Sequence, residues 1–332
     1  MDKKDVILEV KNLSTTFRTQ RGNYKAVDGV DFHVKKGEIL GIVGESGCGK
    51  SVTVQSVMRL YDEKRTAVYG GCALLEGKNL FDLPFKEMRK IRGPKISMVF
   101  QDALSALNPL MKIGPQIVEA ISIHGEKNKK SAYLKAVDIL KAVGIPSPEK
   151  RFYQYPHELS GGMRQRVMIG IALACRPKLL IADEPTTALD VTIQAQILDL
   201  MKELNQEMDM GIILITHDLA VVSKTCERVL VMYLGQIVEE GEAGKLFACP
   251  SHPYTVSLME SIPHMEGDRG KRLNTIKGTV PLLSQIPSGC RFAPRCPRAR
   301  EKCRENMPGL AEIGDGQKVR CWYPVKPGED LV

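Results

Sequence analysis

The eight residues GESGCGKS, Gly44 to Ser51, fit the pattern G-x-x-x-x-G-K-[ST] of a phosphate-binding loop. The strand-like run EILGIV precedes them and the helical stretch VTVQSVMRLY follows them, which is the context that this pattern requires. The glycines let successive backbone N–H groups wrap around phosphate oxygens, and the N-terminus of the next helix adds partial positive charge. We therefore expect Lys50 to reach the β- and γ-phosphates of a nucleotide, and the Ser51 hydroxyl to ligate Mg²⁺.

A second run, KLLIADEP at residues 178–185, is an apolar strand that ends in two acids. Asp183 can complete the Mg²⁺ shell, and Glu184 can polarise a water for in-line attack on the γ-phosphate. Gln101 follows the strand-like ISMVF and could contact the metal and the water, while His217 ends GIILITH and could sense the γ-phosphate. Together these residues indicate nucleotide hydrolysis. The alternative is that the two acids only cap the following helix.

Outward from these motifs, the chain alternates short β-rich runs with helical stretches from Ile7 to about Glu240, which is typical of an α/β fold on a largely parallel sheet. At ACPSHPY, residues 248–254, the composition changes to Pro and Gly punctuation with little helical or strand periodicity. We therefore predict two domains: residues 1–247 form a nucleotide-binding domain, and residues 248–332 form a small C-terminal domain.

The composition suits a folded protein, because 43% of the 332 residues are hydrophobic and 26% are charged. The start, MDKKDVILEV, lacks the apolar segment and cleavage site of a signal peptide, and no apolar run reaches the roughly 18 residues that span a bilayer. We thus expect a cytoplasmic protein whose nine cysteines are not disulfides. The net charge of +8 would suit an anionic partner, but with 5% aromatic residues and no stacking pattern we expect no nucleic-acid binding.

The stretch LSGGMRQRV, Leu159 to Val167, places Ser160, Gly161 and Gly162 at the start of an amphipathic helical run. Such a turn can bind an anion, yet it has no lysine and no metal ligand, and one phosphate site does not need two such turns. With this stretch, the chain from about residue 7 to residue 245 resembles the ATP-binding cassette ATPases, whose signature motif this is. The other motifs of that family follow in the expected order: the loop at Gly44–Ser51, Gln101, the signature, Asp183 with Glu184, Asp190 in ALD, and His217.

The resemblance implies the fold of that family: a P-loop NTPase with a parallel-sheet core, an N-terminal antiparallel β part and a helical subdomain at about residues 102–172. It implies two subunits arranged head to tail, in which each signature contacts the ATP that the other subunit's loop holds. The implied cofactors are ATP and Mg²⁺, with the metal held by Ser51, Gln101 and Asp183. The implied nucleotide contacts are Gly44, Glu45, Ser46, Gly47, Cys48, Gly49, Lys50, Ser51 and Val52 within the subunit, and Ser160, Gly161, Gly162 and Gln165 across the dimer. Asp190 stands in the D-loop, and Glu184, His217 and Gln101 are the implied catalytic residues.

Members of the family also stack adenine on an aromatic residue near the end of the first strands. Phe17 in STTFRT is the first candidate in this chain, and Tyr24 in GNYKAV is the second, because the intervening loop blurs the register. Either ring could equally belong to the ordinary core.

Four of the nine cysteines, Cys290, Cys296, Cys303 and Cys321, fall within 32 residues with the spacing C-x5-C-x6-C-x17-C. Zinc sites usually contain a C-x2-4-C pair, which this spacing lacks. Four thiolates in compact, Pro-rich loops suit an iron–sulfur cluster at least as well, and zinc or unligated thiols stay open from the spacing alone. The arginines among them could offset the negative charge of a cluster; they are Arg291, Arg295, Arg298 and Arg300.

Three further stretches resemble one branch of the family, the oligopeptide and dipeptide permease ATPases, which also includes nickel importers. They are SHPYT at residues 251–255, IPSGCRFAPRCPRA around Cys290, and QDALSALNPLMKIGPQI from Gln101 onward. This closer resemblance implies a [4Fe–4S] cluster on the four cysteines, and hence a small C-terminal domain stapled by a metal site. It also implies that the chain is the ATPase subunit of an importer of dipeptides or oligopeptides.

The partners implied by that role are a second, related ATPase in a heterodimer, two transmembrane permease subunits, and an extracellular or periplasmic peptide-binding protein. The subunit would then lie at the cytoplasmic face of the membrane. In the family the region after Gln101 receives the membrane subunits, so the apolar side chains there are available for that contact or, equally, for burial within the chain (Leu104, Leu107, Leu110, Met111). Two alternatives stay open: nickel as the substrate, and a soluble cassette ATPase that acts in iron–sulfur assembly.

Overall fold

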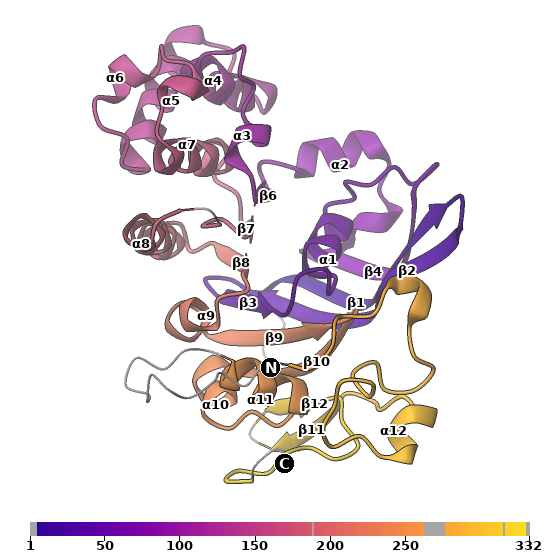
Figure 1. Ribbon diagram of the computed structural model, residues 1–332. Coiled ribbons are helices and arrows are strands. Elements are labelled where there is room, and N and C mark those ends of the chain that lie inside the picture. Colours follow the sequence, from indigo (N-terminus) through magenta and orange to yellow (C-terminus); the bar gives the residue numbers. More distant parts are fainter. Residues whose placement is uncertain (1–4, 188, 262–275, 315, 330–332) are drawn as a thin grey trace. The chain divides into compact units, whose positions relative to one another are not determined.

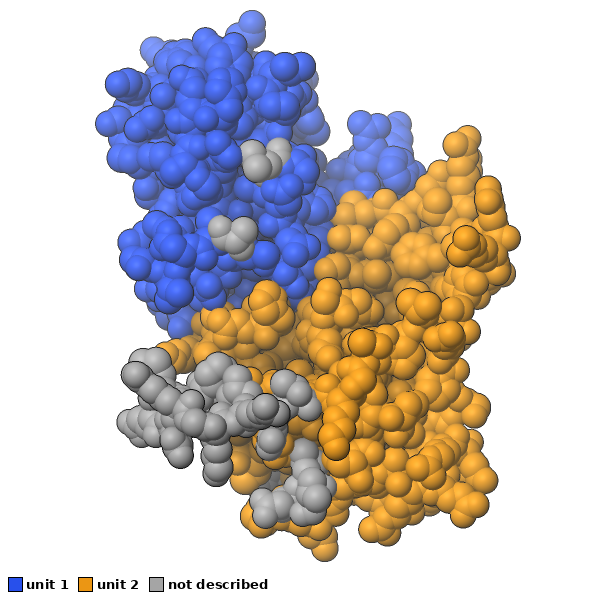
Figure 2. All heavy atoms as spheres, viewed as in Figure 1, with its two compact units in different colours: residues 1–9, 33–39, 74–215 blue, residues 10–32, 40–73, 216–332 orange. Residues whose placement is uncertain are grey.

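The structure is a computed structural model that describes residues 5–187, 189–261, 276–314 and 316–329, with only the backbone described at Leu104 (Figure 1). It divides into two compact units, each built from several stretches of the chain (Figure 2). The first unit comprises residues 1–9, 33–39 and 74–215, and the second comprises residues 10–32, 40–73 and 216–332.

The first unit is built on a parallel sheet in which β7 (Leu179–Asp183) pairs with β6 (Ile96–Val99) on one side and with β8 (Gly211–Ile215) on the other. Every residue of these three strands is buried. Parallel strands covered on both faces read as continuous apolar runs, and the sequence has such runs here. Because parallel strands end at one edge, the residues that follow β6 and β7 are brought to the same side of the sheet.

Helices of the first unit gather after β6, and three of them pack together: α4 (Ile113–Ile123), α5 (Lys129–Ala142) and α7 (Gly161–Leu173) (Figure 1). Helix α4 buries Ile113, Ile117 and Ile121, which recur at helical spacing and form its inner face. These helices lie in the range predicted for a helical subdomain. The other elements of this unit are β5 (Lys78–Asn79), η2 (Leu80–Asp82), α2 (Phe85–Ile91), α3 (Ala103–Ala106), α6 (Pro148–Arg151), η3 (Pro156–Glu158) and α8 (Val191–Met208).

The second unit contains a mixed sheet with the order β11-β12-β10-β9-β3. Strand β3 (Ile39–Val43) pairs in parallel with β9 (Arg228–Tyr233), and β9 pairs antiparallel with β10 (Gln236–Glu242). The short strands β11 (Ala311–Gly314) and β12 (Gln317–Val319) pair with each other, and β12 also pairs with β10.

Most residues of three long N-terminal strands also belong to the second unit. Strands β1 (Val6–Thr19) and β2 (Gly22–Lys35) form a hairpin, and β4 (Ala67–Leu75) lies next to β1. This hairpin is the antiparallel part that the family resemblance predicts. The remaining elements are α1 (Lys50–Val57), α9 (Leu219–Thr225), α10 (Ala243–Ala248), α11 (Pro253–Glu260), η4 (Leu283–Gln285) and α12 (Glu301–Glu305).

The C-terminal region contains two strands, β11 and β12, that were not predicted from the sequence. Both strands are too short to show an alternating hydrophobic pattern in the sequence. Strand β12 lies beyond the predicted domain boundary at residue 247, yet it pairs with β10, which lies before that boundary. The tail and the preceding chain therefore share a sheet, and the boundary itself stays a prediction. None of the helices in the described ranges is long and apolar enough to cross a bilayer.

Candidate functional site

The predicted phosphate-binding loop joins the end of β3 to the start of α1 in the second unit. Its N-terminal strand is fully buried, and Gly49, the N-cap of α1, has a φ of 104° in the left-handed region. Gly49 lacks the side chain that this conformation disfavours, so the chain can turn from strand to helix in one residue. The sequence thus forms the strand, loop and helix that the motif predicts.

Gly44 opens the loop at a point where no side chain fits. A Cβ there would lie 2.8 Å from Cys48 Sγ, and the carbonyl oxygen of Met232 on β9 is closer still. Cys48 is almost fully buried, and burial raises the pKa of its thiol. A buried thiol with a raised pKa is a poor nucleophile, so Cys48 acts here as a small space-filling residue.

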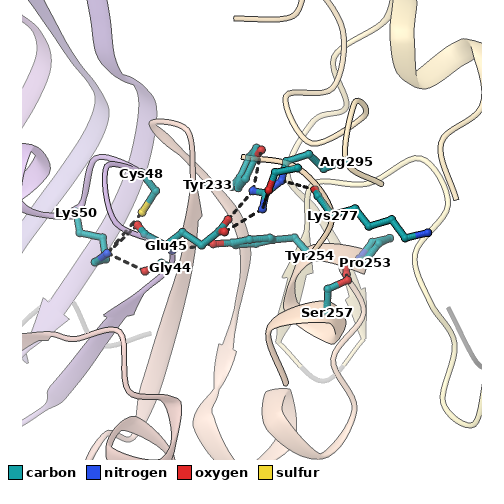
Figure 3. Close-up of polar contacts among 11 residues, drawn as sticks. Gly44, Glu45, Cys48, Lys50, Tyr233, Pro253, Tyr254, Ser257, Lys277 and Arg295 are labelled. Atoms are coloured by element: carbon teal, nitrogen blue, oxygen red, sulfur yellow. Dashed lines mark hydrogen bonds and ion pairs between the residues drawn. The ribbon is translucent and has the colours of Figure 1, made fainter. Parts of the chain in front are cut away.

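Lys50 points into the loop (Figure 3). Its ammonium Nζ donates to the carbonyl oxygens of Gly44 at 2.8 Å and Glu45 at 3.0 Å, and the residue is 5% exposed. The charge of Lys50 is therefore held among the backbone atoms of the loop, where a phosphate chain would lie.

Two residues from the C-terminal region contact the loop at Glu45 (Figure 3). The backbone N–H of Glu45 donates to the hydroxyl oxygen of Tyr254 at 2.8 Å. The guanidinium of Arg295 donates to both carboxylate oxygens of Glu45, at 2.6 and 2.9 Å. Sequence reasoning missed both contacts. It assigned Tyr254 only to the family-typical stretch SHPYT and Arg295 to the proposed cluster, and no spacing in the sequence shows that either residue returns to the loop.

In the first unit, the structure brings Gln101 and Glu184 together. Gln101 Nε2 donates to Glu184 Oε2 at 2.9 Å, and the hydroxyl of Thr187 donates to the same oxygen at 2.9 Å. Glu184 follows β7 with a φ of 46°, which turns its side chain out of the strand direction. Asp183, the last residue of β7, is 3% exposed. The edge of the sheet therefore carries an amide and two carboxylates, as predicted, and Thr187 is an addition to the predicted set.

The signature stretch forms the start of α7, with Ser160 as the N-cap; the Ser160 hydroxyl accepts from Met163 N at 3.4 Å. Ser160 and Gly161 are exposed, which suits contact with another molecule. Gly162 lies against α8, because a Cβ on it would be 2.8 Å from Cγ2 of Ile193. Gln165 is buried, and its Nε2 has no hydrogen-bond partner among the described residues.

Asp190, the predicted D-loop residue, caps helix α8. Its carboxylate accepts from Ile193 N at 2.9 Å. Ala188 of the same loop lies outside the described residues. The start of α8 thus holds Asp190 by local hydrogen bonding and holds Gly162 by packing, so both motifs lie around one helix end.

The remaining nucleotide-site candidates lie in the second unit. Phe17 on β1 packs edge to face on Tyr61, with ring centroids 4.9 Å apart. Tyr24 on β2 donates its hydroxyl proton to the carbonyl of Arg21 at 3.1 Å. His217 follows β8 and is exposed. The choice between the two aromatic rings for adenine stays a prediction.

The four C-terminal cysteines are free thiols and line one small cavity. Cys303 is buried and the other three are half-buried. The rest of the wall is largely apolar or aromatic and includes Phe292, Ala293, Trp322 and Tyr323. Among the described residues no three or more His, Cys, Asp or Glu side chains are grouped closely enough to hold a metal ion.

The arginines between these cysteines form ion pairs or stacking contacts with other residues. Arg295 pairs with Glu45, Arg291 pairs with Asp28, and Arg298 pairs with Glu329. The expectation that they offset the charge of a cluster is therefore not supported, because carboxylates already neutralise three of the four. Arg300 instead stacks over the ring of Tyr323, with its Cζ 4.2 Å from the ring centroid.

Comparison with known proteins agrees with these motifs. The family model "ABC transporter" matches residues 27–187, and the model "Oligopeptide/dipeptide transporter, C-terminal region" matches residues 238–303. The "Probable peptide ABC transporter ATP-binding protein y4tR" of Sinorhizobium fredii is 52% identical over 320 residues, which cover 96% of each chain. The chain belongs to the ABC transporter family.

Two further comparisons concern a related transport protein and a solved structure of an ATP-binding cassette. The "Oligopeptide transport ATP-binding protein AppD" of Bacillus subtilis is 51% identical, and the match covers 98% of each chain. Among solved structures, the dimeric post-hydrolysis state of the ATP-binding cassette MJ0796, bound to ADP and Pi, aligns with a TM-score of 0.64 at 29% identity. That alignment covers 71% of this chain and 98% of the other, so the ATPase fold predicted from the motifs is confirmed.

Proposed function

We propose that the chain is the ATP-hydrolysing subunit of an importer of dipeptides or short oligopeptides. The observation that carries this proposal is the match of its C-terminal region, residues 238–303, to the model of oligopeptide and dipeptide transporters, next to an ATPase site with no degraded position. The names of the two relatives described above include peptide transport and oligopeptide transport. The alternative of a soluble ATPase in iron–sulfur assembly has no support in these comparisons.

The phosphate-binding loop is the proposed site of the ATP phosphates. Lys50 supplies the positive charge for the β- and γ-phosphates, and the backbone N–H groups of Gly47 to Ser51 supply hydrogen bonds at the start of α1. Ser51, Gln101 and Asp183 offer hydroxyl, amide and carboxylate oxygens, which are the donors that Mg²⁺ prefers. The metal would neutralise phosphate charge in this site.

Glu184 is the proposed general base. Gln101 and Thr187 donate to its Oε2, so the carboxylate has a defined direction from which it can accept the proton of an attacking water. His217 is proposed to contact the γ-phosphate. We further propose that Ser160, Gly161, Gly162 and Gln165 contact the ATP of a partner ATPase. The exposure of Ser160 and Gly161 at the start of α7 supports this contact, whereas Gln165 is buried.

Replacement of Glu184 by Gln tests the proposed hydrolysis. The amide keeps the shape of the side chain but cannot accept the proton, so steady-state ATPase activity should fall by roughly 10²- to 10⁴-fold while ATP binding persists. Chromatography with ATP should then detect a trapped dimer with the related ATPase. Glu203→Gln, on the exposed side of α8, is the matched control. Unchanged ATPase activity in Glu184→Gln would contradict the assigned role.

We propose a [4Fe–4S] cluster on Cys290, Cys296, Cys303 and Cys321. The four thiols line one cavity and form no disulfide, which suits this donor set. The spacing C-x5-C-x6-C-x17-C also lacks the C-x2-4-C pair that zinc sites usually contain. The proposed role is structural, since the tail has only short elements with which to build a core.

The measurement for the cluster is the visible absorption spectrum of protein purified without oxygen, with its iron, sulfide and zinc contents. About four irons and four sulfides per chain are expected, and Cys296→Ser should lose them. Cys249→Ser is the matched control, because Cys249 is an exposed cysteine outside the cavity. Zinc, or no metal at all, in the wild-type protein would refute the cluster.

The proposed partners are a second, related ATPase, two transmembrane permease subunits and an extracellular or periplasmic peptide-binding protein, with this subunit at the cytoplasmic face of the membrane. Part of the expected contact region supports this assembly. Leu110 is 86% exposed, as a docking residue should be. Leu107, in contrast, is 2% exposed and belongs to the core of the first unit, so it is not available for docking. Met111 is half-buried.

A further inference from the structure

We propose that Arg295, in the C-terminal region, is a positioning residue for nucleotide binding that neutralises and holds Glu45 inside the phosphate-binding loop. The pair is bidentate, with Nη1 to Oε2 at 2.6 Å and Nη2 to Oε1 at 2.9 Å (Figure 3). Arg295 is the more enclosed partner, since its side chain is 5% exposed against 27% for Glu45. Paired arginine and carboxylate groups of this geometry are among the strongest hydrogen-bonded contacts in proteins.

The charge of Glu45 makes this pairing matter for function. Glu45 is the second residue of a loop whose task is to bind a polyphosphate, so an unpaired carboxylate there would repel the ligand. Arg295 removes that repulsion without adding a net positive charge of its own. The site can then rely on Lys50 and the backbone N–H groups to attract phosphate.

All hydrogen-bonding groups of Glu45 are engaged. The backbone N–H donates to the Tyr254 hydroxyl at 2.8 Å, the carbonyl accepts from Lys50 Nζ at 3.0 Å, and the carboxylate accepts from Arg295. Two of these three partners lie more than 200 residues further along the chain. The conformation of the loop at Glu45 therefore depends on the C-terminal region.

Arg295 is itself held in place. Its Nε donates to the carbonyl of Lys277 at 3.0 Å, and its guanidinium lies 5.8 Å from the centroid of the Tyr233 ring. The ring of Phe292 packs on Tyr233 and Tyr254, with centroids 5.2 and 5.3 Å away. These contacts fix the orientation of the Arg295 side chain. The Arg295–Glu45 pair is therefore already formed in the protein without nucleotide, and nucleotide binding does not have to order it.

A second arginine supports the loop from another side. Arg291 donates to the carbonyl of Leu234 and to the carboxylate of Asp28. The next residue after Leu234, Gly235, donates its N–H to the carbonyl of Cys48 in the loop at 2.7 Å. Arg295 therefore contacts the phosphate-binding loop directly, whereas Arg291 contacts Leu234, whose neighbour Gly235 contacts the loop.

The test is a double-mutant cycle in the full chain, with the dissociation constant of Mg·ATP measured by calorimetry for Arg295→Gln, Glu45→Gln and the double variant. Arg295→Gln should weaken binding by about tenfold or more, because the charge of Glu45 is left unpaired beside the phosphates. Glu45→Gln alone should change binding by less than about threefold, and the double variant should return to within about threefold of wild type. The effect of Arg295→Gln should also shrink at high salt, which screens repulsion.

The controls separate this role from a loss of structure. Arg300→Gln removes a tail arginine that stacks on Tyr323 and should bind Mg·ATP like the wild type. If Arg295→Gln does not fold, Arg295→Lys keeps the charge and should bind more weakly than wild type, with KM raised and kcat little changed. A double variant as weak as Arg295→Gln, or an equal loss in Arg300→Gln, overturns the proposal. The inference rests on ATP binding at the loop, which Lys50→Ala tests separately.

Discussion

Replacement of Gly44 by Ala should destabilise the second unit more than the same replacement at Gly47. Both glycines have a positive φ, 149° at Gly44 and 78° at Gly47. They differ in their surroundings: a Cβ on Gly44 would lie 2.8 Å from Cys48 Sγ and closer still to the carbonyl oxygen of Met232, whereas a Cβ on Gly47 meets no atom within 4 Å. The comparison therefore separates the strain of the backbone from the overlap with neighbouring atoms.

The expected magnitudes follow from these surroundings. An L side chain in the left-handed region costs about 1–2 kcal/mol, which applies to Gly47→Ala, and the φ of 149° at Gly44 costs at least as much. Non-bonded atoms prefer a separation of about 3.5–4.0 Å, so in Gly44→Ala the methyl group or its neighbours must move by at least about 0.7 Å. Met232 belongs to β9, which pairs on both sides, and its backbone cannot easily yield. Overpacking of this kind adds about 1–3 kcal/mol, which gives about 2–5 kcal/mol in all for Gly44→Ala.

The assay is urea unfolding followed by circular dichroism, with no nucleotide present so that ligand contacts do not contribute. Melting temperatures provide a second measure, at about 2–4 °C for each kcal/mol. Gly44→Ala should lose at least about 1 kcal/mol more than Gly47→Ala. Equal losses in the two variants, or a larger loss at Gly47, would show that contact with Met232 and Cys48 does not determine the residue at position 44.

Two further predictions concern charge. Lys50→Ala should weaken ATP binding by roughly 10- to 100-fold, because a charged hydrogen bond to phosphate is lost; calorimetry checks this, and unchanged affinity would refute the phosphate site. Glu76 accepts hydrogen bonds from Lys178 and Lys95, which lower its pKa below the ordinary 4.5. Ionised Glu76 therefore stabilises the fold above pH 4.5, and this contribution is lost as the pH falls through the lower, folded-state pKa. The melting temperature of Glu76→Gln should accordingly lie below wild type at pH 7 and approach it as the pH falls below 4.5 and through the lowered pKa of Glu76; a constant difference at all pH values would contradict this reasoning.

Part of the site could be predicted from the sequence, because the conformation of each motif depends on residues close to it in the chain. The strand, glycine loop and helix around Gly44–Ser51 are contiguous, and their conformation depends on neighbours within a few residues. The same holds for Ser160 and Asp190, each of which caps the helix that directly follows it. The family resemblance added roles to these residues, and the comparison with relatives confirms the family.

Other expectations depended on burial, which pattern alone does not settle. Leu107 and Leu110 are similar side chains three residues apart in one apolar stretch, yet one is buried and the other is exposed. The arginines among the cysteines were likewise expected from the sequence to be available to a cluster, although Arg291 and Arg295 pair with carboxylates of Asp28 and Glu45, 263 and 250 residues away. Which partner a side chain binds depends on which segment of the chain packs against it in the tertiary structure.

The sequence by itself determined the family, the ATPase motifs and the presence of four cysteines near the C-terminus, because these are properties of residue type and local order. Only the tertiary structure decided that Gln101 meets Glu184 across 83 residues, and that Tyr254 and Arg295 reach Glu45 across 209 and 250. The pairing of parallel strands fixes the first contact, since it brings the ends of β6 and β7 to one edge. The other two depend on the C-terminal region being held to the sheet of the second unit through β10 and β12, and on the packing of Tyr233, Tyr254 and Phe292. Such contacts form between segments that are remote in the chain. They therefore produce no local pattern of residue types or spacings from which they could be predicted.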